Sequence, residues 1–219
     1  MDPCHDGAPT ETGKSDSPTI WIMTHRRTAA RLALLGAAAL VATACAGGET
    51  STQEADPAAQ ESVQVSATYA EGGDGPAYTY DTELVPAGAT VEVTSTATDG
   101  STTTTLRVTG LQPNRTYGSH AHTEPCTPTA GADAGPHYQF SEDPVTPSVD
   151  PAYANPQNEI WLDVTTDATG AGEATSTVPW TFPEDRRAES VVLHEEPTAT
   201  HAGHAGTAGG RPGCVTVDF

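Results

Sequence analysis

The sequence predicts an all-β fold for residues 61–219 of this 219-residue chain. From Glu61 onward, short segments alternate polar and apolar residues and are rich in Val and Thr, as half-buried strands are. No apolar periodicity of helical length interrupts them. Turn residues separate the segments, for example E-G-G-D-G-P at 71–76 and T-D-G-S at 98–101. Many short strands at even spacing indicate one β-sandwich or barrel domain.

Eight strands can be placed along this domain, followed by a closing segment. The expected strands are 62–69, 77–84, 89–97, 101–109, 115–122, 158–166, 172–180 and 188–195, with 213–219 as the closing strand. Two long irregular stretches remain, 123–157 and 195–212. Loops of that length in a compact domain commonly carry function.

The N-terminal segment is predicted to carry an export signal. Residues 1–22 have no structural pattern and are interpreted as an irrelevant upstream extension, since Met23 begins a basic head followed by a short apolar run. That layout over 23–45 is typical of a secretory signal peptide, and the run is too short to span a membrane. It ends in A-T-A-C, which looks like a bacterial lipobox. We therefore expect Cys45 to be acylated and the protein to be an exported lipoprotein on the outer face of the cell membrane. Ordinary cleavage after Ala44 is the alternative.

Residues 46–60 are small, polar and acidic, which is typical of a flexible linker. The whole chain has a formal net charge of −20, and after Cys45 there are 25 acidic side chains, five arginines and no lysine. Nucleic acid and anionic lipid headgroups are therefore poor partners. The same charge repels an anionic substrate.

Four histidines carry the chemistry expected of the domain. The segment G-S-H-A-H places His120 and His122 on one face of a strand, because successive side chains alternate between faces. Two imidazoles on one face form half of a metal site, although a lone H-x-H more often contains a buried core histidine. His137 in G-P-H-Y and His194 in S-V-V-L-H could supply the other half.

Two cysteines and an arginine complete the pattern. Cys126 follows the first histidine pair, and G-G-R-P-G-C contains Arg211 and Cys214. These are the only cysteines left in the exported domain, an even number that suits one bridge in an oxidising compartment.

In this order the motifs resemble those of the copper/zinc superoxide dismutase family, from about residue 61 to Phe219. The resemblance implies a flattened eight-stranded Greek-key barrel and dismutation of superoxide to oxygen and hydrogen peroxide. It also implies copper as the cofactor, bound by His120, His122, His137 and His194.

The resemblance assigns further roles as well. It implies a Cys126–Cys214 disulfide, and it implies that Arg211 holds superoxide beside copper. His137 corresponds to the histidine that bridges copper and zinc in the family, which takes up a proton and returns it to peroxide.

The zinc ligands of the family are missing from this sequence. No histidine occurs from residue 139 to residue 193. Three aspartates there could each offer an oxygen but make no credible zinc set: Asp143, Asp150 and Asp163. We therefore expect a copper-only site, in which the second nitrogen of His137 faces solvent or a carboxylate. The loop aromatics Phe140, Tyr153 and Trp161 are expected to fill the core.

The loop 195–212 also departs from the family, because it has no lysine to guide superoxide and places Glu195 and Glu196 beside a ligand. Arg211 is its only positive charge, so we expect a slow encounter with the anion. The same loop contains His201 and His204, which are either accessory copper ligands or solvated polar residues.

Two functions remain open from the sequence. The first is an envelope-anchored superoxide dismutase. The second is a copper-binding or copper-handling protein on the same fold with little turnover, because a fold does not fix a function. The sequence does not indicate an oligomeric state.

Overall fold

Ten strands and one short 3₁₀ helix make up the part of the chain that this computed structural model describes, residues 61–219. The predicted upstream extension, signal peptide, Cys45 anchor and linker lie outside the described residues. The 3₁₀ helix η1 spans Gly131–Ala134, and no helix of the described part is long and apolar enough to cross a membrane. The strands are β1 Glu61–Thr68, β2 Ala77–Thr79, β3 Thr90–Thr98, β4 Ser101–Thr109, β5 Thr116–Tyr117, β6 Ser119–His122, β7 Val164–Thr165, β8 Gly172–Val178, β9 Ser190–Leu193 and β10 Gly213–Thr216. The all-β prediction is confirmed.

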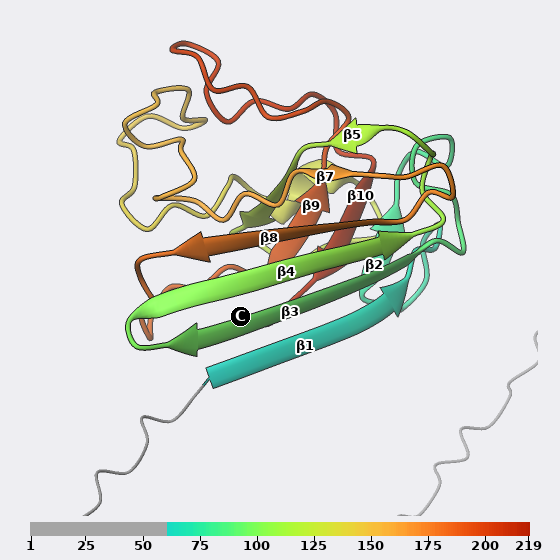
Figure 1. The fold of residues 1–219 in the computed structure, drawn as a ribbon, viewed down its shortest axis with the longest axis horizontal. Helices are drawn as coiled ribbons and strands as arrows, with labels where there is room; N and C mark the ends of the chain where they lie inside the picture. Colours follow the sequence, from blue (N-terminus) through green and yellow to red (C-terminus); the bar gives the residue numbers. More distant parts are fainter. Residues whose placement is uncertain (1–60) are drawn as a thin grey trace, which may run out of the picture. The chain divides into compact units, whose positions relative to one another are not determined.

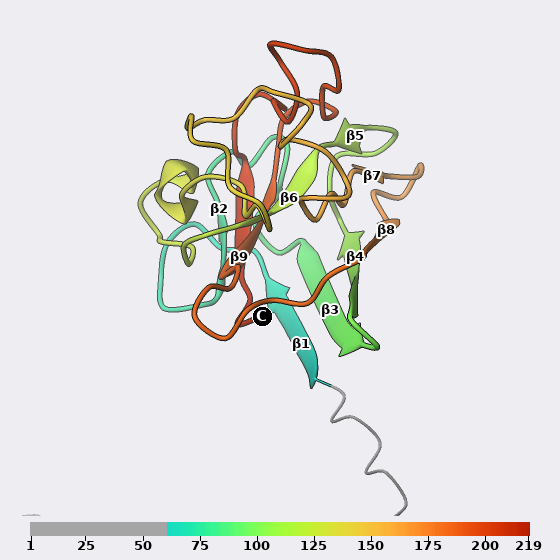
Figure 2. The same cartoon turned by 90° about the vertical axis from the view of Figure 1, so that its left-hand side faces the viewer.

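The strands form two four-stranded sheets and one small two-stranded sheet. The first sheet has the order β1-β3-β4-β8 and the second β2-β10-β9-β6, while β5 pairs only with β7. Figures 1 and 2 show the two larger sheets as separate layers. These two sheets account for the eight strands expected of a flattened barrel or sandwich.

The core lies between the two larger sheets. Alternate residues of the first sheet point inward and are buried, and residues of the second sheet meet them: Val91, Val93, Leu106, Val108, Val191, Leu193 and Val215. The opposite face of the first sheet is polar, with threonine pairs such as Thr103–Thr177 joined by hydroxyl hydrogen bonds. This inward-apolar, outward-polar pattern is what strand alternation in the sequence predicts.

Three predicted strands differ from the observed ones. Residues 115–122 divide at Gly118, where the chain leaves β7 and joins β9, and a Cβ there would lie 2.6 Å from the carbonyl oxygen of Glu196. The strand expected at 77–84 ends at Thr79, since Tyr80 bonds Pro212 and the Asp81 carboxylate caps a turn.

The strand expected at 158–166 is regular only in β7. Its first part runs beside β6 through single hydrogen bonds, from Leu162 N to Ser119 O and from Ala121 N to Ile160 O. The segment is extended, but it forms an isolated bridge instead of a ladder.

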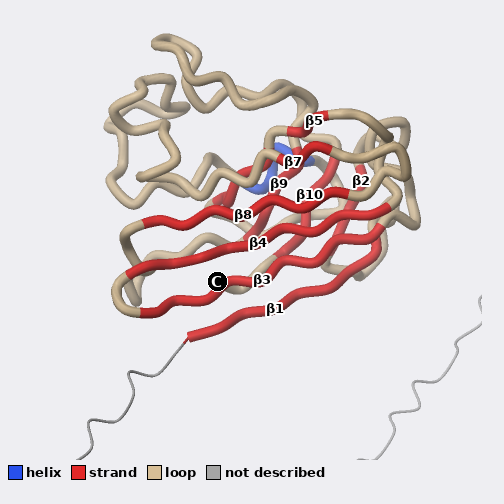
Figure 3. Tube along the Cα trace, viewed as in Figure 1, coloured by secondary structure: helices blue, strands red, loops and turns tan. Residues whose placement is uncertain are grey.

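The two long loops lie together over one end of the domain, as Figures 1 and 3 show. They are joined by a hydrogen bond from Gly203 N to Val149 O. The expected core role of the loop aromatics is wrong for Phe140, which remains 43% exposed and stacks on Trp180 with ring centroids 5.1 Å apart. Trp161 and Tyr153 are half-buried and lie outside the core cluster, and the Trp161 indole N–H donates to a carboxylate of the site described below.

Candidate metal centre

The structure brings together the four histidines that the sequence singled out. His120 and His122 lie on β6, and His194 follows the end of β9, the antiparallel neighbour of β6. His137 comes from the loop after η1, which is held against β6 by the hydrogen bond from Tyr138 N to Ala121 O. One ring nitrogen from each histidine lies within 4.8 Å of the others. Within residues 61–219 this is the only group of three or more potential metal ligands.

The spacing of the nitrogens fits one metal ion. His122 Nε2 and His194 Nε2 are 3.2 Å apart, and the ring centroids of His120 and His137 are 4.0 Å apart. Two imidazole nitrogens that share one ion at about 2.0–2.1 Å are separated by roughly 2.9–3.4 Å for angles between square and tetrahedral. The His122–His194 pair therefore already has the spacing of two ligands on one ion, and the ligand nitrogens of the other two histidines lie within 4.8 Å.

Hydrogen bonds to the outer ring nitrogens hold three of the imidazoles in orientation. His120 Nε2 bonds the Thr198 hydroxyl at 2.7 Å, His122 Nδ1 the Gly135 carbonyl at 2.9 Å, and His137 Nδ1 the Glu159 carboxylate at 2.8 Å. The opposite nitrogen of each ring is left for a ligand. His120 Nδ1 is buried and has no hydrogen-bond partner in the described residues. A buried nitrogen without a partner is costly unless something binds it, and a metal ion fits that need.

Three of the four histidines are held neutral, as metal ligands must be. Burial lowers the pKa of His120 and of His122 well below the ordinary value, and the neighbouring histidines and Arg211 lower it further. Burial lowers the pKa of His194 to about 3, with His137 and Arg211 adding to the effect. At neutral pH these three rings therefore offer lone pairs instead of protons.

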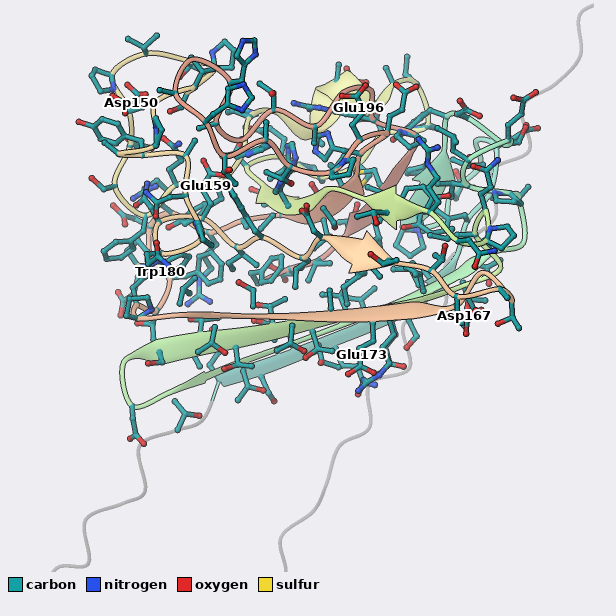
Figure 4. All side chains as sticks on the ribbon, turned by 45° about the horizontal axis from the view of Figure 1, so that its top comes forward. Asp150, Glu159, Asp167, Glu173, Trp180 and Glu196 are labelled. Atoms are coloured by element: carbon teal, nitrogen blue, oxygen red, sulfur yellow. A yellow bond between two sulfur atoms is a disulfide. The ribbon has the colours of Figure 1, made fainter. Side chains whose placement is uncertain are left out.

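Glu159 is a functional residue that the sequence analysis missed. It is 1% exposed, and its carboxylate accepts hydrogen bonds from His137, from Trp161 Nε1 at 2.6 Å and from Gln139 Nε2 at 2.7 Å. Figure 4 shows it beneath the loops. The alternation in N-E-I-W-L-D places Glu159, Trp161 and Asp163 on one face, which is the signal that could have identified it.

Asp163 reaches a second histidine through Thr198. The Thr198 hydroxyl accepts from His120 and donates to Asp163 Oδ1 at 2.5 Å, and Thr198 N donates to the other carboxylate oxygen at 2.9 Å. These hydrogen bonds thus link loop 195–212 to β6. Asp143 and Asp150 instead accept backbone N–H groups of their own turns.

Arg211 lies beside the cluster and is fixed by backbone carbonyls. Its Nη1 donates to Gly135 O at 2.7 Å and to Gly131 O at 3.2 Å, and burial lowers the pKa of the guanidinium from its ordinary value. Gly135 O also accepts from His122, so the arginine and a histidine share one acceptor. The positive charge is therefore held at a fixed position next to the imidazoles.

A cavity of about 590 Å³ opens on the site. His137, His194, Glu159 and Arg211 are among its lining residues, and both long loops contribute to its walls. Two of the four histidines, His137 and His194, therefore border this cavity.

The disulfide that the resemblance implied is present between Cys126 and Cys214, with Cα atoms 5.8 Å apart. It ties the loop that contains η1 to β10. The carbonyls that hold Arg211 flank η1, so the bridge and the arginine belong to one corner of the site.

Two predicted features lie outside the cluster. His201 and His204 are exposed in loop 195–212 and do not join the other four histidines. Glu195 and Glu196 are also exposed, and Glu195 accepts from Gly210 N. Figure 4 places Glu196 at the surface above β5 and β6.

Comparison with known proteins gives likenesses of shape alone. No model of a protein family matches the chain, and no curated protein matches its sequence. A Cu/Zn superoxide dismutase from Brucella abortus is similar with a TM-score of 0.49 and 15% identity, over 73% of this chain and 99% of that one. A double mutant of a SOD-like protein from Bacillus subtilis is similar with a TM-score of 0.47 and 15% identity, over 71% of this chain and 95% of that one. The chemistry of the site therefore has to be argued from its own geometry.

Proposed function

We propose that this protein binds one copper ion through its four clustered histidines and dismutates superoxide to oxygen and hydrogen peroxide. The observation that carries the proposal is the convergence of four imidazole nitrogens within 4.8 Å, with Arg211 fixed beside them in the lining of a cavity. A metal site open to solvent with a neighbouring positive charge suits a small anionic substrate.

Copper is the metal that we assign to the site. Neutral imidazoles bind copper, zinc, iron and nickel, and copper binds most tightly in the divalent series. The orphaned Nδ1 of His120 supports a bound ion at this position. His137 Nδ1, which would have to face a second metal, is instead occupied by Glu159. We therefore propose a copper site without zinc.

When bound, copper would supply one-electron redox chemistry, alternately accepting an electron from one superoxide and donating one to the next. The protein supplies position, charge and protons. Arg211 would hold superoxide by a charge-assisted hydrogen bond while its Nη1 stays anchored on carbonyls. Two superoxide anions and two protons give one oxygen and one hydrogen peroxide, so each cycle needs two protons at the site.

His137 is placed to handle one of these protons. It is the least buried of the four histidines and lines the cavity, and its Nδ1 is held by the buried Glu159 carboxylate. That carboxylate favours an Nδ1–H tautomer, so Nε2 is the nitrogen that would bind copper. The same nitrogen would carry the proton whenever it is not bound to the metal, and the cavity beside His137 offers the peroxide a way out.

The proposal is tested on the purified chain loaded with copper, with and without zinc. Bound metal per chain and superoxide decay by pulse radiolysis are measured in the same samples. We expect one tightly bound copper per chain and no retained zinc. Superoxide should decay far faster than in buffer without the protein. Decay at the control rate with a filled site would exclude the enzyme.

A second candidate, a copper-binding protein with little turnover, is favoured by one observation. Glu195 and Glu196 are exposed next to the ligand His194, and no lysine offsets them. Arg211→Ala separates the two functions. In an enzyme it lowers the decay rate and leaves copper affinity almost unchanged, whereas a copper carrier shows no change in either.

We also propose that the protein is exported and anchored through a lipid on Cys45. The support is the sequence alone: a basic head, a short apolar run and A-T-A before the cysteine. Metabolic labelling with a radioactive fatty acid is expected to mark the wild-type chain and not Cys45→Ala. Equal labelling of both would contradict the anchor.

A further inference from the structure

The turn H-A-G-H in loop 195–212 places two exposed imidazoles side by side. The ring centroids of His201 and His204 are 4.9 Å apart, with the ring planes tilted by 36°. The turn is closed by a hydrogen bond from His204 N to His201 O at 3.1 Å. Two imidazoles at this separation can bind one ion after a small rotation of either ring.

The turn is held in place at its base. Ala199 N donates to Thr207 O and Gly206 N donates to Ala199 O, both at 2.9 Å, so hydrogen bonds join the two segments of the loop on either side of the turn. Gly203 has a φ of +83°, which favours glycine, and its N–H bonds Val149 O on the neighbouring loop. The two rings therefore share a defined support.

We propose that His201 and His204 form a second, weaker site for a divalent transition-metal ion, with Cu(II) as the ion taken. Imidazole is a ligand of choice for Cu(II), which binds nitrogen sites more tightly than the other divalent ions of its row. Water completes the coordination of a two-histidine site. The net charge of −20 concentrates cations around the molecule.

Asp150 lies on the loop that neighbours the turn. A hollow of about 330 Å³ is lined by Asp150 on that loop and by Ala202 and Gly203, the two residues between His201 and His204. Figure 4 labels Asp150 on that loop. Its carboxylate adds to the negative charge on this side of the domain, which favours the approach of a cation.

The second site is close in sequence to residues that line the cavity beside His137 and His194. Gly206 is two residues from His204, and a Cβ built on it would lie 3.7 Å from His137 Nδ1. Gly206 and Thr207 also line the cavity with His137 and His194. From this position the second site would capture copper and pass it to the four clustered histidines. That role rests on the proposed copper function, whereas binding of Cu(II) by His201 and His204 does not.

The test uses the full chain with one equivalent of copper already bound. Further Cu(II) is added and followed by electron paramagnetic resonance and calorimetry. We expect one additional, weaker Cu(II) with nitrogen coupling from two imidazoles in the wild type, and none in the His201→Ala/His204→Ala variant. Ala202→Ser is the matched control, because it changes the same turn but keeps both rings, and it should bind like the wild type.

Copper uptake by the metal-free chain gives an independent readout. Quenching of tryptophan fluorescence should be several-fold slower in the double variant, with the same final amount of tightly bound copper. No second ion in the wild type, or the same second ion in the double variant, would overturn the proposal. If the clustered histidines fail to bind copper, the first equivalent gives the two-imidazole signal, and its loss in the double variant still tests this site.

Discussion

At the scale of single residues, the proposed function gives Arg211 a role toward the substrate and not toward the metal. It makes no hydrogen bond to any of the four histidines, and its Nη1 rests on the carbonyls of Gly131 and Gly135. A charge-assisted hydrogen bond contributes about 1.5–3 kcal/mol, so Arg211→Ala should slow superoxide decay roughly ten- to a hundredfold. Copper affinity, measured by competition with a chelator, should stay within about a factor of two to three, the ordinary scatter for a group that is not a ligand. A parallel loss of copper would mean that the arginine holds the site together, and Arg211→Lys should recover part of the rate.

Glu159 acts through His137. Its carboxylate accepts hydrogen bonds from His137, Gln139 and Trp161. Glu159→Gln keeps the shape of the side chain but replaces one carboxylate oxygen with an NH₂ group, which then faces one of these donors. Gln139 cannot compensate by turning its amide, since its own oxygen accepts from Asp143 N. We expect copper affinity or turnover to fall roughly ten- to a hundredfold, as for other partners of metal-bound histidines.

Gln112→Glu serves as the control, because it makes the reverse amide–carboxylate exchange at an exposed residue between β4 and β5 that contacts none of the four histidines. Unchanged copper affinity and turnover in Glu159→Gln would show that the carboxylate is not needed to orient His137.

The lowered histidine pKa values make the metal-free protein sensitive to acid. In the folded chain His194 titrates at about 3, against about 6.5 when unfolded, so the unfolded state binds more protons between these values. The contribution of such a histidine to the free energy of unfolding is fully present above pH 6.5. It falls as the pH is lowered toward 3, by up to about 1.4 kcal/mol per pH unit for each such histidine. Urea midpoints of the metal-free protein at a series of pH values measure this. His194→Gln should flatten the slope, and an equal slope in both proteins would contradict the account.

At the scale of elements, β6 and β9 position three of the four clustered histidines, and the disulfide fixes the segment whose carbonyls hold Arg211. The Cys126–Cys214 bridge closes a loop with a sequence separation of 88, which stabilises the fold by about 4–5 kcal/mol on the chain-entropy account. Cys126→Ser/Cys214→Ser should therefore lower the free energy of unfolding by roughly that amount. It should also reduce turnover, since the η1 carbonyls no longer fix Arg211, while β6 and β9 still place His120, His122 and His194. Urea unfolding and copper counting on the variant measure both effects, and loss of copper together with turnover would contradict this division of roles.

At the scale of the whole molecule, the acidic surface repels anions, so under the proposed function it opposes the approach of superoxide. With 25 acids against five arginines after Cys45, long-range steering is repulsive and only Arg211 attracts the anion locally. Salt screens the long-range part, over about 10 Å at 0.1 M. The rate of superoxide decay should therefore stay level or rise as salt is added at low ionic strength. A steep fall with salt would show that an attractive field dominates.

Alternation and turn chemistry were sufficient to predict the strands that are paired along their whole length, such as β1, β3, β4 and β8. The shortened strands could not be predicted, because β6 begins where Gly118 changes partners, a contact that exists only in the folded chain. The four histidines stood out through their motifs. Glu159 and Thr198 did not, because a lone glutamate in an expected strand or a lone threonine in a loop looks solvated until folding places it against an imidazole.

The central claim is that the four clustered histidines form one copper site, and counting the ligands of the bound ion tests it most directly. The copper-loaded chain is treated with a mild chelator to remove weakly held metal, and the remaining copper is counted and examined by X-ray absorption and pulsed paramagnetic resonance. The account predicts one copper per chain bound by imidazole nitrogens, and no such copper in His120→Ala/His122→Ala. Copper held mainly by carboxylate oxygens, or a tightly bound copper that survives in this variant, would contradict it.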